Sequence, residues 1–98
     1  MSIQLKFKTT KPENVEFWWE INPKKMTIIE KFIESLPGFV SYSQSLINPN
    51  ERDQTIVFDT NENLKNYNAT LYTCKEAVER KTYNDANGIV TVSTVTII

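Results

Sequence analysis

The side chains that most often transfer protons or bind metals are scarce in this sequence. It contains no histidine, the commonest general base and metal ligand in proteins. The single cysteine, Cys74, has no histidine to activate it, which favours a buried structural thiol over a nucleophile. Glu16 and Glu20 lie four residues apart and could share one helix face, but no opposing acid or base can be assigned to them. The sequence therefore indicates no catalytic residue, no metal site and no cofactor.

Aromatic side chains offer a different chemistry, the binding of apolar or aromatic ligands. Two tryptophans are adjacent in the segment EFWWE, residues 16–20. Neighbouring side chains on a helix point about 100° apart, so Trp18 and Trp19 cannot both lie on one narrow core stripe. One indole is expected to pack inward, whereas the other would cover a pocket mouth or meet a second subunit. Ordinary core and interface packing is the alternative for both indoles.

Composition limits the possible partners. A chain of 98 residues can bury one modest core, so residues 1–98 are expected to form a single domain. No apolar run approaches the ~18 residues of a membrane span. Lys and Arg number 11 against 12 Asp and Glu, so no positive field favours nucleic acid. The amino terminus, MSIQLKFK, lacks a signal-peptide pattern and the lone cysteine suits a reducing compartment, so we expect a cytoplasmic location.

Hydrophobic periodicity predicts a strand and then a helix in the first part of the chain. Apolar and polar residues alternate over residues 3–8, which is typical of a half-buried strand. A short helical piece is expected over residues 12–19, and Asn22 can cap the helix that follows. That helix begins at Pro23 and ends at the LPG sequence of residues 36–38. Its apolar stripe consists of Met26, Ile29, Phe32, Ile33 and Leu36.

The next segment predicts a hairpin. Residues 39–47 and 54–59 have the composition of strands, and the sequence NPNERD between them is typical of a turn. Val40, Tyr42 and Leu46 are expected to share one face of the first of these strands.

The last third of the chain predicts a second helix and a final strand. Thr60 or Asn61 caps a helix that extends to about Arg80. Residues 89–98 are rich in β-branched residues, and a shift in their apolar phase indicates a bulge or a strand covered on both faces. The inward stripe of the helix consists of Leu64, Tyr67, Leu71, Cys74 and Val78.

The order β-α-β-β-α-β predicts an α+β, ferredoxin-like fold with two main helices on one face of a four-stranded antiparallel sheet. The other face would be bare, and a whole exposed sheet face with Val, Ile and Tyr on it would form a large apolar patch, which pairing two copies face to face would cover. We therefore expect a homodimer. RNA-recognition modules share this order, but they need stacking aromatic residues on the first and third strands. Here the third strand offers only Phe58, and Phe7 of the first strand is in phase with Leu5 instead of facing solvent.

In element order and in the sequence LPGFVSYSQ, residues 36–44, the chain resembles the dimeric α+β-barrel superfamily. This superfamily includes antibiotic-biosynthesis-type monooxygenases, haem-degrading monooxygenases and stress-responsive barrel proteins. The resemblance implies a homodimer that holds a ligand between the sheet and the helices of each subunit. It also implies that Asn, Trp and Tyr side chains could bind an aromatic substrate and its oxygen adduct without a cofactor. The absence of histidine disfavours haem chemistry.

These considerations favour a homodimer that binds a small, largely apolar ligand such as a fatty acid. A cofactor-independent monooxygenase acting on an aromatic or polyketide-like substrate is the first alternative, and a structural dimerisation module without a ligand is the second. The expected cavity walls are aromatic or aliphatic and consist of Phe7, Trp18, Trp19, Phe32, Tyr42, Phe58, Tyr67 and Leu71.

Overall fold

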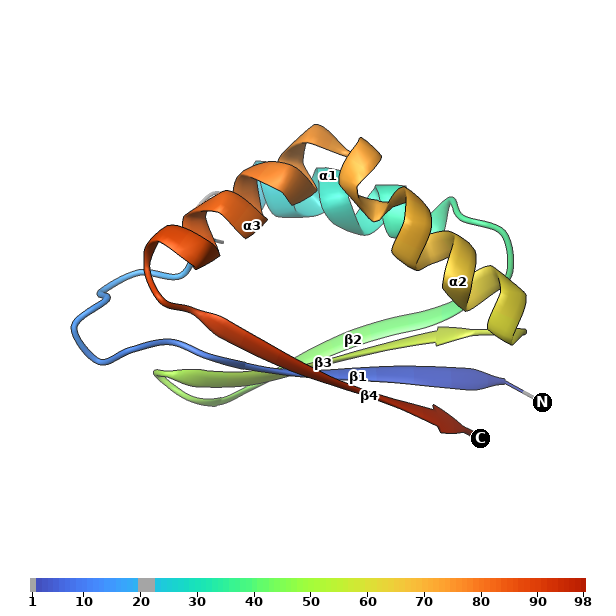
Figure 1. Ribbon diagram of the computed structural model, residues 1–98, viewed down its shortest axis with the longest axis horizontal. Helices are drawn as coiled ribbons and strands as arrows, with labels where there is room; N and C mark the ends of the chain where they lie inside the picture. Colours follow the sequence, from blue (N-terminus) through green and yellow to red (C-terminus); the bar gives the residue numbers. More distant parts are fainter. Residues whose placement is uncertain (1, 20–22) are drawn as a thin grey trace.

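The predicted order of strands and helices is confirmed by a computed structural model, which describes residues 2–19 and 23–98. Figure 1 shows the helices as one layer on one face of the sheet, with the other face uncovered. The elements are β1 (Ile3–Thr10), α1 (Pro23–Glu34), β2 (Phe39–Asn48), β3 (Glu51–Phe58), α2 (Asn61–Thr70), the 3-10 turn η2 (Leu71–Thr73), α3 (Lys75–Ala86) and β4 (Val90–Ile97).

The sheet is antiparallel with the strand order β2-β3-β1-β4, which is the ferredoxin-like topology. The central strand β1 pairs with β3 and β4 along its whole length, so that Leu5 lies opposite Ile56 on one side and Val95 on the other. Directly opposite residues project from the same face of a sheet. The register therefore assigns each paired strand residue to the helix-facing or the uncovered side.

The hydrophobic core lies between the helices and the sheet. Met26, Ile29 and Ile33 of α1 are buried, and Phe32 and Leu36 pack against them from partly buried positions, which confirms the predicted stripe of this helix. At the centre of the core Phe58 is completely buried. Its ring packs against those of Phe39 and Tyr67, with centroids 6.2 and 5.6 Å away.

The predicted second helix is broken. Thr60 caps α2 as expected, because its side chain accepts a hydrogen bond from the backbone N–H of Asn63. The chain then forms η2, and Cys74 is extended, with φ −81° and ψ 117°, before α3 begins. The break rotates α3 relative to the predicted stripe, so Ala77 is buried while Val78 is 42% exposed. The inward position predicted for Val78 is therefore wrong.

Residues 12–18 do not form the short helix predicted for them; they make a turn followed by irregular chain. The buried side chain of Lys11 binds this segment to the β2–β3 turn, because its Nζ donates to the carbonyl of Val15 and to Oδ1 of Asn50 at 3.0 Å. Trp18 donates from Nε1 to the carbonyl oxygen of Pro49 at 3.2 Å. The cap predicted at Asn22 lies outside the described residues.

Two strand predictions need correction. A register shift between Phe39 and Ser41 turns Val40 out of the row, whereas Tyr42 and Leu46 lie opposite the helix-facing residues Ile56 and Arg52. The shared face predicted for Tyr42 and Leu46 is therefore confirmed, whereas the register does not assign Val40 to either face. β4 pairs with β1 in unbroken register and is exposed along its whole length, so this strand has neither the predicted bulge nor cover on both faces.

The uncovered face of the sheet is mainly polar, contrary to our expectation of a large apolar patch. The apolar residues that the register assigns to this face are Val57 on β3, and Val90 and Val92 on the edge strand β4. The remaining residues that the register assigns to this face are polar or charged: Gln4, Lys6, Lys8, Thr10, Ser41, Ser43, Ser45, Asn48, Glu51, Asp53, Thr55, Thr94 and Thr96. The homodimer therefore cannot be argued from the need to bury an apolar sheet face, and it stays a prediction.

α1 and α3, the longest helices in the described part of the chain, have 12 residues each. None of the described helices has the length and apolar character needed to cross a bilayer.

Candidate functional site

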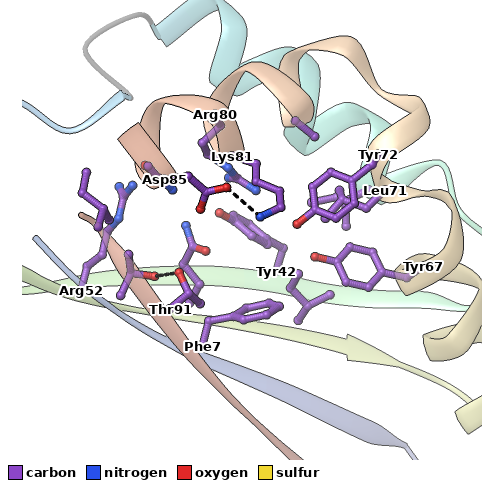
Figure 2. Close-up of a pocket in the computed structure, with 17 residues that line it drawn as sticks. Phe7, Tyr42, Arg52, Tyr67, Leu71, Tyr72, Arg80, Lys81, Asp85 and Thr91 are labelled. Atoms are coloured by element: carbon purple, nitrogen blue, oxygen red, sulfur yellow. Dashed lines mark hydrogen bonds and ion pairs between the residues drawn. The ribbon is translucent and has the colours of Figure 1, made fainter. Parts of the chain in front are cut away.

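A cavity of about 180 Å³ lies between the helix layer and the sheet. Figure 2 shows α3 on one side of it, the strands on the other and the end of α2 closing it. The strand side is lined by Phe7, Thr9, Tyr42, Arg52, Gln54, Ile56 and Thr91, and the helix side by Ile33, Tyr67, Leu71, Tyr72, Ala77, Arg80, Lys81, Asn84 and Asp85, with Ile89 beside β4.

The aromatic part of the cavity comes from four separate elements. Phe7 on β1 and Tyr42 on β2 project from the helix-facing side of the sheet, and Tyr67 and Tyr72 come from α2 and η2. Figure 2 shows the hydroxyl groups of Tyr67 and Tyr72 directed toward Lys81 and Asp85. A ligand in this space would meet ring faces and hydroxyl donors together.

Tyr67 is held in place by its ring, which packs on Phe58 in the core and leaves the residue only 2% exposed. Its hydroxyl makes no hydrogen bond to any residue of 2–19 or 23–98, and its side chain lines the cavity. Burial raises the pKa of this phenol well above its ordinary value, although the charge of Arg80 opposes the shift. Tyr67 therefore remains a hydrogen-bond donor at neutral pH.

The helix side of the cavity is charged. Asn84 lies four residues after Arg80 and three after Lys81 on α3, and all three side chains line the cavity. Lys81 donates to Oδ2 of Asp85 at 3.0 Å, and this hydrogen bond raises the pKa of Lys81 above its usual value. Arg80 forms no ion pair with any residue of the described ranges, so its charge is available to a ligand.

On the strand side of the cavity, polar side chains are joined by hydrogen bonds between neighbouring strands. Thr9 and Thr91 share a hydrogen bond of 3.1 Å between their Oγ1 atoms across β1 and β4. Oε1 of Gln44 accepts from the hydroxyl of Tyr42 at 3.3 Å and from Nε2 of Gln54 at 3.2 Å. These contacts orient Thr9, Thr91, Tyr42 and Gln54, which line the cavity.

The structure brings together four of the eight side chains that the sequence suggested as cavity walls. Phe7, Tyr42, Tyr67 and Leu71 all line the cavity. The other four lie elsewhere: Phe58 and Phe32 belong to the core, Trp19 packs against the core and lines a separate hollow beside α3, and Trp18 covers the β2–β3 turn and lines an outer groove.

Sequence reasoning missed the polar residues of α3. The sequence predicted one continuous second helix, and that prediction placed Val78 on its inner face. The residues that line the cavity from α3 were therefore expected to point elsewhere. Once Ala77 is taken as the inward residue, Arg80, Lys81 and Asn84 follow at helical spacing. A small buried residue, Ala77, followed by polar residues at three- and four-residue steps, was the signal available.

Comparison with known proteins supports the fold assignment. No protein-family model matches the sequence, and no curated protein matches it. A variant of SnoaB, a cofactor-independent oxygenase from Streptomyces nogalater, superposes with a TM-score of 0.68 at 11% identity, over 99% of this chain and 92% of that one. A candidate antibiotic biosynthesis monooxygenase from Deinococcus radiodurans gives 0.63 at 11% identity, over 98% and 91% of the two chains.

A third match is Rv0793 from Mycobacterium tuberculosis, with a TM-score of 0.62 at 8% identity over 100% of this chain and 95% of that one. The chain therefore has, over its whole length, the ferredoxin-like fold of antibiotic biosynthesis monooxygenases and dimeric α+β-barrel proteins. At these identities the likeness shows the fold alone.

Proposed function

We propose that this protein is a cofactor-independent oxygenase that acts on a small acidic aromatic compound bound between the sheet and α3. The observation that carries the proposal is the composition of the cavity: aromatic rings on the strand side face the cationic side chains of Arg80 and Lys81 on α3. The solved structures with the same fold include an enzyme named as a cofactor-independent oxygenase, which makes this reaction class the first to test.

The volume favours a compact, flat ligand. An apolar cavity of about 150 Å³ is enough to hold benzene, and this cavity measures about 180 Å³. Phe7 and Tyr42 offer ring faces on which such a ligand can stack. A small phenol matches both the size and the lining.

The charges favour the ionised form of such a ligand. A positive group within about 4–6 Å of an acid lowers the pKa of that acid by roughly 1–3 units. Arg80 supplies this charge, and the hydroxyl of Tyr67 can donate a hydrogen bond to the resulting anion. The proton that the ligand loses on ionisation passes to solvent or to the carboxylate of Asp85, which lines the cavity.

An electron-rich aromatic anion can react with O₂ without a metal or flavin. When the reacting carbon is a CH₂ activated by neighbouring rings, it loses both hydrogens and becomes a carbonyl carbon. One atom of O₂ becomes the carbonyl oxygen and the other leaves as water, so no external reductant is required. The role of the protein is then to bind the substrate, favour its ionisation and stabilise the negative charge.

Binding of a fatty acid, which we expected from the sequence, has less support. Ligand pockets for molecules of that size commonly measure about 300–1,000 Å³, and the present cavity is smaller. Its charged helix side also suits a polar aromatic compound better than a long alkyl chain. We propose a homodimer as the working assembly, and a purely structural dimerisation module would leave the convergence of Tyr67, Arg80 and Asn84 without a role.

Oxygen uptake tests the proposal. Purified protein, treated with a chelator and free of flavin absorbance, is mixed with hydroxylated anthrones and naphthols in an oxygen electrode. We expect saturable uptake whose rate rises with pH as the bound substrate ionises. Arg80→Met should raise the midpoint of that profile by roughly one pH unit. Lys75→Met removes an equal charge from an exposed position on the same helix, outside the cavity, and should leave the profile unchanged.

Two results would contradict the proposal. One is the absence of protein-dependent uptake with every compound of the panel. The other is an equal effect of both substitutions, because it would mean that net charge, rather than Arg80 in the cavity, controls the reaction.

A further inference from the structure

A second hollow lies next to the cavity on the helix-facing side of the sheet. This outer groove measures about 330 Å³ and is lined chiefly by Phe17, Trp18, Gln44, Leu46 and Arg52. Arg52 lines the cavity as well, so the two spaces share a wall.

The two hollows follow one another along a single pair of strands. Tyr42, Gln44 and Leu46 alternate along β2 on the face toward the helices, opposite Ile56, Gln54 and Arg52 of β3. The first cross-strand pair lines the cavity and the last lines the groove. Because a strand rises about 3.3 Å per residue, about 13 Å separate Tyr42 from Leu46. The cavity and the groove together are therefore long enough for an elongated, flat molecule.

The boundary between the hollows consists of side chains. Gln44 accepts hydrogen bonds from Tyr42 and Gln54 there, and the guanidinium of Arg52 lies 4.5 Å from the centroid of the Trp18 ring. Trp18 is itself fixed by its hydrogen bond to the carbonyl of Pro49. Glutamine and arginine side chains have several rotatable bonds, so a ligand can cross this boundary without moving the sheet.

We infer that the outer groove is a second subsite, which holds the flat distal end of a ligand too long for the cavity, with Arg52 and the indole of Trp18 as its walls. Leu46, which is 65% exposed beside these two residues, supplies the apolar surface that such a ligand would bury. The inference rests on ligand binding in the proposed cavity, although it does not require oxygenation.

Tryptophan fluorescence gives a direct readout of the groove. The chain has two tryptophans, so Trp19→Phe leaves Trp18 as the sole indole emitter. Two ligands are compared in this background: a naphthol, and the same naphthol extended by a phenyl ring at the far end of its long axis. We expect both to bind, but only the extended compound should change the Trp18 emission strongly and bind more tightly.

Leu46→Ser tests the apolar wall. It should weaken binding of the extended compound by about 3- to 10-fold and leave the unsubstituted naphthol unchanged. Val40→Ser is the matched control, because Val40 is also an exposed aliphatic residue of β2 but lies outside the groove. Both positions are exposed, so loss of folding is not expected in either variant.

Equal affinities for the two ligands, an equal effect of the two serine substitutions, or no binding of either ligand would overturn the inference. These outcomes are separate from those of the oxygen electrode. Preference for the extended ligand without oxygen uptake would support the subsite and reject the oxygenase, whereas oxygen uptake with equal affinities would do the reverse.

Discussion

Replacing Tyr67 by Phe separates the structural role of this residue from its proposed role in binding. The aromatic ring is almost fully buried and packs on Phe58, and both features are kept in the variant. The hydroxyl faces the cavity and has no hydrogen-bond partner in the described ranges, so its loss removes no intramolecular contact. We therefore expect the free energy of unfolding at neutral pH to change by no more than about 1 kcal/mol. Tyr67→Ala, which also deletes the ring, should cost about 3–5 kcal/mol.

Ligand binding should respond differently to Tyr67→Phe. A hydrogen bond from a neutral donor contributes about 0.5–1.5 kcal/mol, and more when the acceptor is charged. The affinity for an ionised naphthol should thus fall by roughly 3- to 10-fold or more.

The pH dependence of stability should change as well in Tyr67→Phe. In the native protein the pKa of Tyr67 is raised above 10.0, its ordinary value. The favourable contribution of the neutral hydroxyl is complete below pH ~10 and is lost as pH rises toward the native pKa, by up to about 1.4 kcal/mol per pH unit. The variant lacks this ionisation, so its stability should fall less steeply in alkali.

Urea unfolding at neutral and alkaline pH, together with ligand titration, measures these effects. The wild-type protein and Tyr67→Ala serve as the two references. The reasoning is refuted if Tyr67→Phe loses several kcal/mol of stability at neutral pH, since the hydroxyl would then have a structural partner. An unchanged ligand affinity would remove Tyr67 from the binding site.

Three further predictions concern the packing and the assembly of the chain. Cys74→Ala should cost about 1–2 kcal/mol without affecting ligand binding, and thiol reagents should label the buried native thiol slowly; rapid labelling would contradict this. Gly38→Ala should cost at least about 1–2 kcal/mol in thermal unfolding, because Gly38 has φ +75° and a Cβ there would lie 2.2 Å from Oδ1 of Asp59; an unchanged melting temperature would show that the turn can relax. Light scattering should give about twice the monomer mass of 11.4 kDa, and a persistent monomer at high micromolar concentration would reject the homodimer.

The elements that the sequence predicted well are those in which one periodicity runs without interruption. Alternation over residues 3–8 and the three-four spacing from Met26 to Ile33 correspond to β1 and α1. Thr60 was recognisable as a cap because its hydroxyl can accept from the backbone N–H three residues later. These features depend on local geometry, which neighbouring residues determine.

The errors arise where tertiary contacts override the local pattern. Residues 64–78 keep helical spacing throughout, but the chain breaks at η2 and Cys74 and continues as a rotated helix. The helical signal around Trp18 and Trp19 is likewise overridden, because Lys11 and Trp18 bind the segment to the β2–β3 turn. No spacing rule reports a contact between segments more than thirty residues apart.

The candidate site was accessible in part. Phe7, Tyr42, Tyr67 and Leu71 could be assigned to the space between sheet and helices because their element and their face were both predictable. The polar residues of α3 could not, since their direction depends on the break before that helix. The presence of these polar residues in the cavity is the reason why we now propose an acidic aromatic compound as the ligand instead of an apolar chain.

Isotope labelling of the product tests the oxygenase proposal most directly. Protein free of metal and flavin is incubated with a hydroxylated anthrone under O₂ that carries the heavy oxygen isotope, and the product is analysed by mass spectrometry. We predict one heavy oxygen atom in the new carbonyl group, formed at a rate proportional to protein concentration and greatly reduced in Arg80→Met. Product without the heavy isotope, or product formed equally fast without the protein, would contradict the account.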